Sequence, residues 1–127
     1  MSRAILDTSV FVAEEQGRPL GPLPEQVSIS VVTLAELELG VLLARDTTAR
    51  SRRLRTLVRV RDAVRALPVD GRVASAFSAL VAELRQVGRR LGVNDAWIGA
   101  TAIAHGAILY TQDADFDAVP GLSVIRV

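Results

Sequence analysis

The chain has 127 residues and a mass of 13.6 kDa; half of its residues are hydrophobic and 23% are charged. This length and composition predict a single domain over residues 1–127 and exclude a disordered tail or a low-complexity linker. There is no cysteine, which excludes disulfides, thiolate metal ligands and cysteine nucleophiles.

Neither a membrane span nor a secretion signal is expected. The longest apolar stretch, residues 27–44, contains Glu36 and Glu38, which would be costly to bury in lipid. The first apolar run is interrupted by Asp7 and is too short for the core of a signal peptide. We therefore expect a cytoplasmic protein that has no membrane partner.

Charge is segregated along the chain although the net charge is only +1. Residues 45–65 hold eight arginines against two aspartates, a local charge of +6, which leaves the remainder of the chain at −5. All fifteen basic residues are arginine, so chemistry that requires a lysine is excluded.

The first half of the chain alternates apolar runs with signals for helix starts. Residues 4–6 predict a strand, and Asp7-Thr8-Ser9 predicts a capped turn into a short helix. Two glycines and three prolines make residues 17–25 a loop. A β-branched run at 27–32 predicts a second strand, and the spacing of Thr33 and Glu36 predicts a capping box that opens the next helix.

The middle of the chain predicts two helices separated by a short edge strand. The arginine-rich helix is expected over 46–66, and the strand over 67–69. Asp70 should cap the second helix, which has an apolar face at helical spacing. The predicted core residues of that face are Val73, Phe77, Leu80, Val81, Leu84 and Val87.

The last third predicts a helix rich in small residues that begins at Asn94-Asp95 and ends at His105-Gly106. Strands are expected over 107–111 and 122–127, with an acidic loop over 112–117 between them. Strands that alternate with helices predict an α/β fold, a three-layer α/β/α sandwich around a mainly parallel central sheet.

Four acidic residues fall at equivalent places in this pattern. Asp7 and Asp113 follow strands, whereas Glu36 and Asp95 lie near the starts of helices. In a parallel sheet these positions share one edge, where ligands of such folds bind. Each acid alone could be a cap or a solvated loop residue. Glu38 lies nearer the middle of its helix's apolar arc than Glu36, and Asp115 and Asp117 are also within reach of the edge.

Together the four acids favour a metal site. Two carboxylates about 4 Å apart repel each other by roughly 4 kcal/mol at an effective dielectric constant near 20, so a cluster must bind protons or a cation. Oxygen ligands suit Mg²⁺ or Mn²⁺, which can assist phosphodiester hydrolysis with water as the nucleophile. Ser9, Thr111 and Thr8 stand beside these acids and could orient them.

Four segments of the sequence resemble the PIN-domain ribonucleases, and most closely the VapC toxins of bacterial toxin–antitoxin pairs. They are Leu6-Asp7-Thr8-Ser9, Thr33-Leu34-Ala35-Glu36-Leu37 with Gly40, Asn94-Asp95, and Thr111-Gln112-Asp113-Ala114-Asp115-Phe116. The resemblance implies an endoribonuclease that acts on structured RNA, depends on Mg²⁺ or Mn²⁺, forms a homodimer and is inhibited by a small cognate antitoxin. The family's acidic ligands map onto Asp7, Glu36, Asp95 and Asp113, with hydroxyls at Ser9 and Thr111.

Other functions fit less well. A receiver domain needs a lysine, and a haloacid-dehalogenase-type phosphatase needs an Asp where Ser9 stands. A PIN nuclease of RNA processing or a catalytically silent PIN-like binding module remains an alternative. The arginines of residues 45–65 could bind RNA, lie solvated on a helix, or contact an antitoxin or a second subunit. Arg89 and Arg90 form a smaller patch near Asp95. His105 is expected to cap a helix and Trp97 to pack.

Overall fold

The computed structural model describes residues 3–127, in which five parallel strands form one sheet. The strand order is β3-β2-β1-β4-β5, which places β1 at the centre and β3 and β5 at the edges. The strands are β1 (Arg3–Leu6), β2 (Ser28–Ser30), β3 (Arg65–Leu67), β4 (Ala107–Thr111) and β5 (Ser123–Arg126).

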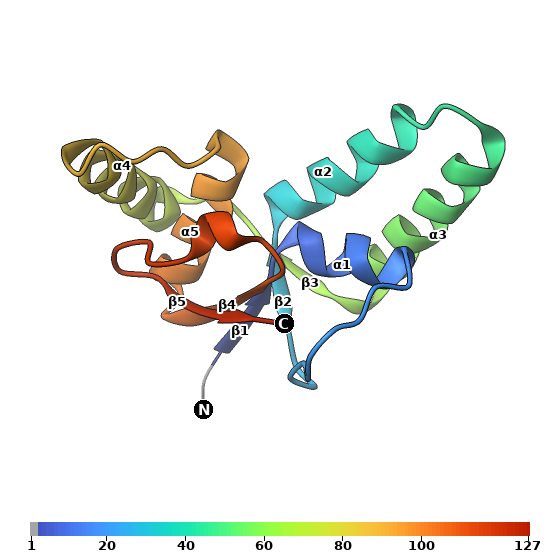
Figure 1. The fold of residues 1–127 in the computed structure, drawn as a ribbon, viewed down its shortest axis with the longest axis horizontal. Coiled ribbons are helices and arrows are strands. Elements are labelled where there is room, and N and C mark those ends of the chain that lie inside the picture. The colour runs from blue at the N-terminus through green and yellow to red at the C-terminus, as the bar shows by residue number, and fades with distance from the viewer. Residues whose placement is uncertain (1–2) are drawn as a thin grey trace.

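Helices connect the strands and cover both faces of the sheet (Figure 1). One side holds α1, α2 and α3, and the other holds α4 and α5. The predicted three-layer α/β/α fold is therefore confirmed. The helices are α1 (Thr8–Glu15), α2 (Val31–Leu42), α3 (Thr47–Ala63), α4 (Gly71–Gln86), α5 (Val93–Ala104) and the short 3₁₀ helix η1 (Ala114–Phe116).

Successive residues of the central strands point to opposite faces and supply two cores. In β1, Leu6 packs with α1, α2 and α3, whereas Ile5 packs with α5. In β4, Leu109 lies on the α5 side and Tyr110 packs against the other core. This period of two is what a strand covered on both faces requires. The two cores pack on opposite faces of the sheet, and the carboxyl ends of β1 and β4 lie next to each other between them, where the register pairs Leu6 with Tyr110.

The predicted capping box at Thr33 is wrong, because the N-cap of α2 lies three residues earlier. Ser30 is the N-cap and its side chain accepts a hydrogen bond from the Val32 amide. Thr33 is fully buried in the first turn, and Glu36 lies in the second turn. The Thr33 hydroxyl takes part in a contact with α1, which no local spacing could reveal.

Several element boundaries also differ from the prediction. The helix α3 ends at Ala63, and the edge strand comes before Pro68 rather than around it, which leaves the proline outside the hydrogen-bonded ladder. Asp70 caps α4 as predicted. Val87 was expected in the core but is 69% exposed, since α4 ends at Gln86.

The arm formed by α2 and α3 extends away from the sheet, on the side opposite α4 (Figure 1). Several large apolar side chains on this arm are exposed: Leu39, Leu42, Leu43, Leu54 and Val58. Between residues 3 and 127, none of the helices combines the length and the apolar character needed to cross a bilayer.

Candidate active site

Asp7 begins the site at the carboxyl end of the central strand. Its backbone N–H donates to the Tyr110 carbonyl at 2.9 Å, which continues the β1–β4 ladder by one residue. The residue occupies the N-cap position of α1, yet its side chain makes no capping hydrogen bond. Asp7 is only 3% exposed. A buried carboxylate that does not cap its helix needs another explanation, so capping alone does not account for Asp7.

Two hydroxyls hold the Asp7 carboxylate. Ser9 donates to Asp7 Oδ2 at 2.7 Å and Thr111 donates to the same oxygen at 2.8 Å. Both hydroxyls also accept from the backbone: Ser9 from the Gln112 amide at 3.0 Å, and Thr111 from the Asp113 amide at 2.9 Å. Each hydroxyl has a single proton, and each donates that proton to the Asp7 carboxylate. Oδ2 is thereby fixed, while no hydrogen bond within residues 3–127 engages Oδ1.

Glu36 reaches the same rim from α2. The Thr8 hydroxyl donates to Glu36 Oε1 at 2.7 Å and lies 3.0 Å from the Thr33 hydroxyl. Glu36 is half-buried, whereas Glu38, the alternative that the sequence left open, is exposed. The side chain of Glu36 is thus oriented by α1, and Glu38 points away from the core.

Asp95, Asp113 and Asp115 form the tightest acidic group of the described chain. One carboxylate oxygen from each lies within 4.8 Å of the others. Asp95 stands in the first turn of α5, and Asp113 caps η1 by accepting from the Asp115 amide at 2.8 Å. The sequence left Asp115 and Asp117 open, and the structure separates them: Asp117 forms an ion pair with Arg126 at 3.2 Å.

The electrostatics show that the other acids of the rim all act on Asp95. The pKa of Asp95 is raised to about 7 by burial first, and then by the negative charges of Asp7, Asp113, Glu36 and Asp115. Asp7 and Glu36 therefore lie outside the tight group of three but within its electric field. In the absence of a cation, the rim is expected to hold a proton on Asp95 near neutral pH.

Arg89 fixes the loop that carries Asp113 and Asp115. Its guanidinium donates to the carbonyls of Asp115 and Ala118 at 2.9 Å, and also to that of Asp117. The sequence predicts that Arg89 and Arg90 form a small basic patch near Asp95, and the structure adds that the Arg89 side chain binds backbone carbonyls of the loop. Only its closeness in sequence to Asp95 hinted at a link with the site.

The arginines of residues 45–65 divide into those with internal partners and those without. Arg52 pairs with Glu15 at 3.7 Å, Arg59 pairs with Glu14, and Arg53 donates to the Gly40 carbonyl at 2.7 Å. These contacts attach α3 to α1 and α2. Other arginines of α3, such as Arg55 and Arg61, are exposed.

Two other residues singled out in the sequence have structural roles. Trp97 stacks on Phe77 of α4, with ring centroids 3.8 Å apart and the planes 15° from parallel. His105 occupies the C-cap of α5, as predicted, followed by Gly106 at φ +59°. It lines a pocket at the opposite edge of the sheet from the acids. Neither residue belongs to the acidic rim.

The donor set suits a hard divalent cation. Its members are carboxylate oxygens, preorganised by hydroxyls and by a turn, with no sulfur or imidazole among them. Mg²⁺ and Mn²⁺ prefer such ligands. A cation would offset the mutual repulsion that raises the pKa of Asp95. The rim is therefore chemically fitted to hold a metal.

The sequence profile described as "PIN domain" matches residues 4–122, a span that includes the whole acidic rim. The chain is 44% identical to Ribonuclease VapC5 of Mycobacterium tuberculosis, over 97% of this chain and 92% of that protein. It is 42% identical to Ribonuclease VapC4 of the same organism, over 98% and 97%.

A solved structure agrees with these sequence relatives. The crystal structure of VapBC-5 from M. tuberculosis, described as a member of the VapBC family of toxin–antitoxin systems, superposes with a TM-score of 0.88 at 40% identity, covering all of both chains. The chain belongs to the PIN-domain family and, within it, to the VapC proteins.

Proposed function

We propose that the chain is a divalent-metal-dependent endoribonuclease that acts in the cytoplasm as the toxin of a toxin–antitoxin pair. The observation that carries the proposal is the convergence of carboxylates from four segments on one rim, with three of their oxygens within 4.8 Å. The relatives named as ribonucleases support the reaction class. Hydrolysis by water is the reaction to expect, because the Ser9 and Thr111 hydroxyls donate to Asp7, the Thr8 hydroxyl donates to Glu36, and the carboxylates are assigned to the metal.

Asp7, Glu36, Asp95 and Asp113 would hold Mg²⁺ or Mn²⁺, with Asp115 close enough to join them. When bound, the metal polarises the scissile phosphate and lowers the pKa of a water molecule. Ser9 and Thr111 hold Asp7 Oδ2 and leave Oδ1 free of hydrogen bonds from the described chain, and Thr8 holds Oε1 of Glu36. These hydroxyls keep like charges close together before any ligand arrives.

Structured RNA is the proposed substrate, and the exposed arginines of α3 are a proposed contact for its backbone. Arg55 and Arg61 are exposed, and the whole segment of residues 45–65 has a charge of +6. Binding through such residues weakens steeply with salt. RNA affinity in chelator should therefore fall as ionic strength rises and should fall further in Arg55→Gln.

A small antitoxin is the proposed protein partner, and the α2–α3 arm is the proposed contact surface. The arm exposes Leu39, Leu42 and Leu43, at 52%, 66% and 66%. Exposed apolar patches of this kind are typical of protein interfaces. The homologous VapBC-5 structure is that of a toxin–antitoxin system. We also propose a homodimer, which sedimentation of the purified chain would test.

The decisive experiment compares cleavage of structured RNA by wild type, Asp7→Asn and Asp117→Asn, with Mg²⁺ and with chelator. Asp7→Asn should lower the rate by at least about 100-fold, because it removes the charge of a ligand that is already held in place. Asp117→Asn is the matched control, since this acid pairs with Arg126 at the surface. Full cleavage in chelator, or by Asp7→Asn, would overturn the metal mechanism. A folded chain that binds RNA but never cleaves it would favour a silent binding module.

A further inference from the structure

A second pocket lies at the opposite edge of the sheet from the acids. Its volume is about 1160 Å³, and it is bordered by the first residues of four strands: Arg3, Ser28, Arg65 and Ala107. Strand pairing brings these residues together, because the register pairs Arg3 with Ala107 and Ser28 with Arg65. Arg72 at the start of α4 and His105 at the end of α5 complete the polar part of the lining.

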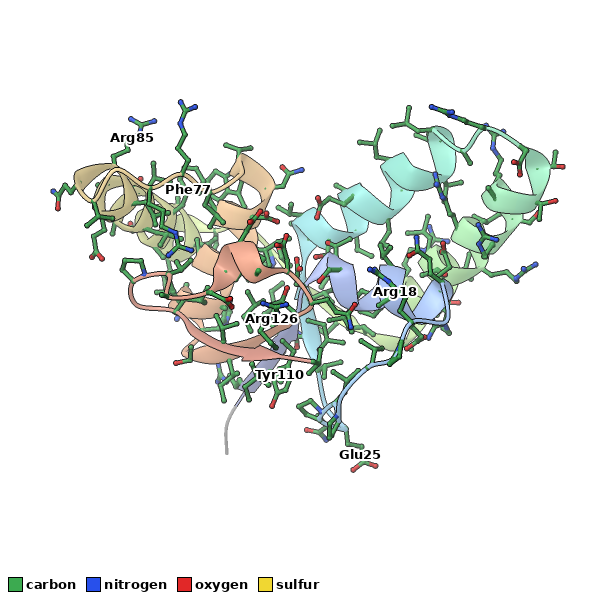
Figure 2. All side chains as sticks on the ribbon, in the orientation of Figure 1. Arg18, Glu25, Phe77, Arg85, Tyr110 and Arg126 are labelled. Carbon is green, nitrogen blue, oxygen red and sulfur yellow. The ribbon has the colours of Figure 1, made fainter. Side chains whose placement is uncertain are left out.

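The pocket concentrates positive charge. Arg3, Arg65 and Arg72 line it, and Glu25, labelled on the loop before β2 in Figure 2, is the one acid among the lining residues that the structure describes. Within residues 3–127, none of the three arginines forms an ion pair, whereas Arg52, Arg59 and Arg126 do so elsewhere. Asp70, two residues before Arg72, offsets part of this charge from outside the lining. A concave surface focuses the field of the charge that remains.

The pKa of His105 responds to the charge of these arginines. The pKa of its imidazole is lowered by burial first and then by Arg72, Arg3 and Arg65, while Asp70 acts in the opposite direction. Its Nε2 is buried and has no hydrogen-bond partner in the described chain. Three guanidiniums from three separate elements therefore act on the same side chain, and all four residues line the same pocket.

The chemistry of the lining indicates what the pocket can bind. Guanidinium groups match the oxygens of phosphate in geometry and charge. Among residues 3–127, no Phe, Tyr or Trp lines the pocket, so a base would find no ring there to stack on. The rest of the wall is largely apolar, with Ile5, Val27 and Val64 among its members. The volume leaves room for the group to which a phosphate is attached.

We propose that this pocket is a phosphate-binding site, separate from the nuclease centre, in which Arg3, Arg65 and Arg72 bind the phosphoryl oxygens. The phosphate could belong to a free mononucleotide or to an RNA strand passing behind the sheet. The chemistry is the same in both cases, and the site needs neither the metal nor cleavage. The proposal therefore stands apart from the nuclease function.

The single histidine provides a direct test by NMR. The imidazole of His105 is titrated with pH in chelator, in the presence of inorganic phosphate, a 5′-mononucleotide or a short RNA oligonucleotide. Each ligand that binds should raise the pKa of His105 by about half a unit or more, because an anion offsets the arginines. A parallel titration in sodium chloride at the same ionic strength measures how far salt screening alone shifts the pKa of His105.

Two exposed arginines of α4 supply a variant and its control. Without ligand, Arg72→Gln should raise the pKa of His105. The further rise in this pKa on adding a phosphate compound should be mostly lost, and phosphate binding should weaken by roughly tenfold. Arg85 lies about 20 Å away along the helix and points outward in Figure 2, so Arg85→Gln should behave as wild type. Asp7→Asn should also leave phosphate binding unchanged.

The outcomes separate the sources. Saturation by the mononucleotide assigns a small-molecule site, whereas a response to RNA alone assigns the site to the backbone of a strand. The proposal is overturned if no phosphate compound shifts His105 beyond the effect of chloride. It is also overturned if Arg72→Gln and Arg85→Gln bind phosphate equally well.

Discussion

The hydroxyl of Thr111 donates a 2.8 Å hydrogen bond to Oδ2 of Asp7 and so joins the end of β4 to the residue that follows β1. The same hydroxyl accepts from the Asp113 amide at 2.9 Å. One fully buried side chain thus sets the position of one acid and of the backbone of another. Thr111 couples the stability of the sheet edge to the geometry of the acidic rim.

Thr111→Val should destabilise the protein by about 1–3 kcal/mol, because it removes a donor from a buried carboxylate and leaves the Asp113 amide without its acceptor. Thr111→Ser keeps both hydrogen bonds and should restore most of the loss. Urea unfolding in chelator measures the effect. Mn²⁺ affinity should fall in parallel, since the Asp7 carboxylate is no longer held.

Thr101→Val is the control for the previous prediction. Thr101 is also fully buried, but its hydroxyl only donates to the Trp97 carbonyl of its own helix. Loss of the Thr101 hydroxyl should lower the free energy of unfolding by less than Thr111→Val does, and it should leave Mn²⁺ affinity unchanged. Equal losses in the two valine variants would show that Thr111 contributes no more than a buried threonine elsewhere.

The raised pKa of Asp95 predicts an unusual pH dependence of stability. The group titrates near 3.8 when unfolded and near 7 in the folded chain, so the folded state binds the proton more tightly. Its contribution to stability is complete below pH 3.8, is lost progressively up to about pH 7, and changes little above that. In chelator, Asp95→Asn should therefore gain stability over wild type across this window and keep the advantage at pH 8.

The comparison must be made as a difference between the two proteins, because His105 acts in the opposite direction. The lowered pKa of its imidazole makes stability rise with pH. Thermal unfolding of wild type and Asp95→Asn at matched pH values cancels that contribution. At pH 8, added Mg²⁺ should stabilise only the wild type and so make it more stable than Asp95→Asn. A constant difference from pH 4 to pH 8 would contradict the prediction.

The fold could be predicted because its signals are local. Alternating apolar runs and caps such as Asp70 depend on neighbours in sequence, and both agree with the structure. The position of Asp7 and Asp95 on one rim followed from the geometry of parallel strands. What could not be predicted depends on contacts between distant segments.

Three particular residues show this limit. Ser30 and Thr33 are both able to cap a helix, and the contact of Thr33 with Thr8, 25 residues away, accompanies the choice of Ser30. Arg89 is predicted to form a small basic patch with Arg90 near Asp95, but its carbonyl partners lie 26 to 29 residues further along the chain. No periodicity or spacing contains such information.

Gly99 provides a test of packing in α5. The nearest atoms to a Cβ built at Gly99 all belong to side chains, with Leu122 and Leu80 at 3.6 Å and Phe116 at 3.9 Å. These are ordinary contact distances. Gly99→Ala should therefore stabilise the protein by about 0.5–1 kcal/mol through helix propensity.

Gly106 is the contrasting case. It has open space around it, but its φ of +59° is costly for any residue with a Cβ. Gly106→Ala should lower the free energy of unfolding by about 1–2 kcal/mol. Denaturant unfolding of the two variants should give shifts of opposite sign. A loss in Gly99→Ala as large as that in Gly106→Ala would mean that α5 has no room for a methyl group.

Arg89 should control metal affinity without touching the metal. Its guanidinium holds three carbonyls of the loop that carries Asp113 and Asp115. Arg89→Ala releases this loop and should weaken Mn²⁺ binding by about 10–100-fold, the range typical for residues that orient metal ligands. Arg89→Lys keeps the charge but loses the fork of donors, so we expect an intermediate affinity.

Arg90→Ala is the matched control, because Arg90 is exposed and next in sequence. It removes the same charge near the rim and should change Mn²⁺ affinity little. If the two alanine variants lose affinity equally, long-range charge rather than loop geometry explains the effect. If Arg89→Ala lowers the melting temperature but leaves Mn²⁺ affinity intact, its hydrogen bonds serve stability alone. A selective loss of affinity in Arg89→Ala, partly restored in Arg89→Lys, would establish that the loop is positioned by its carbonyls.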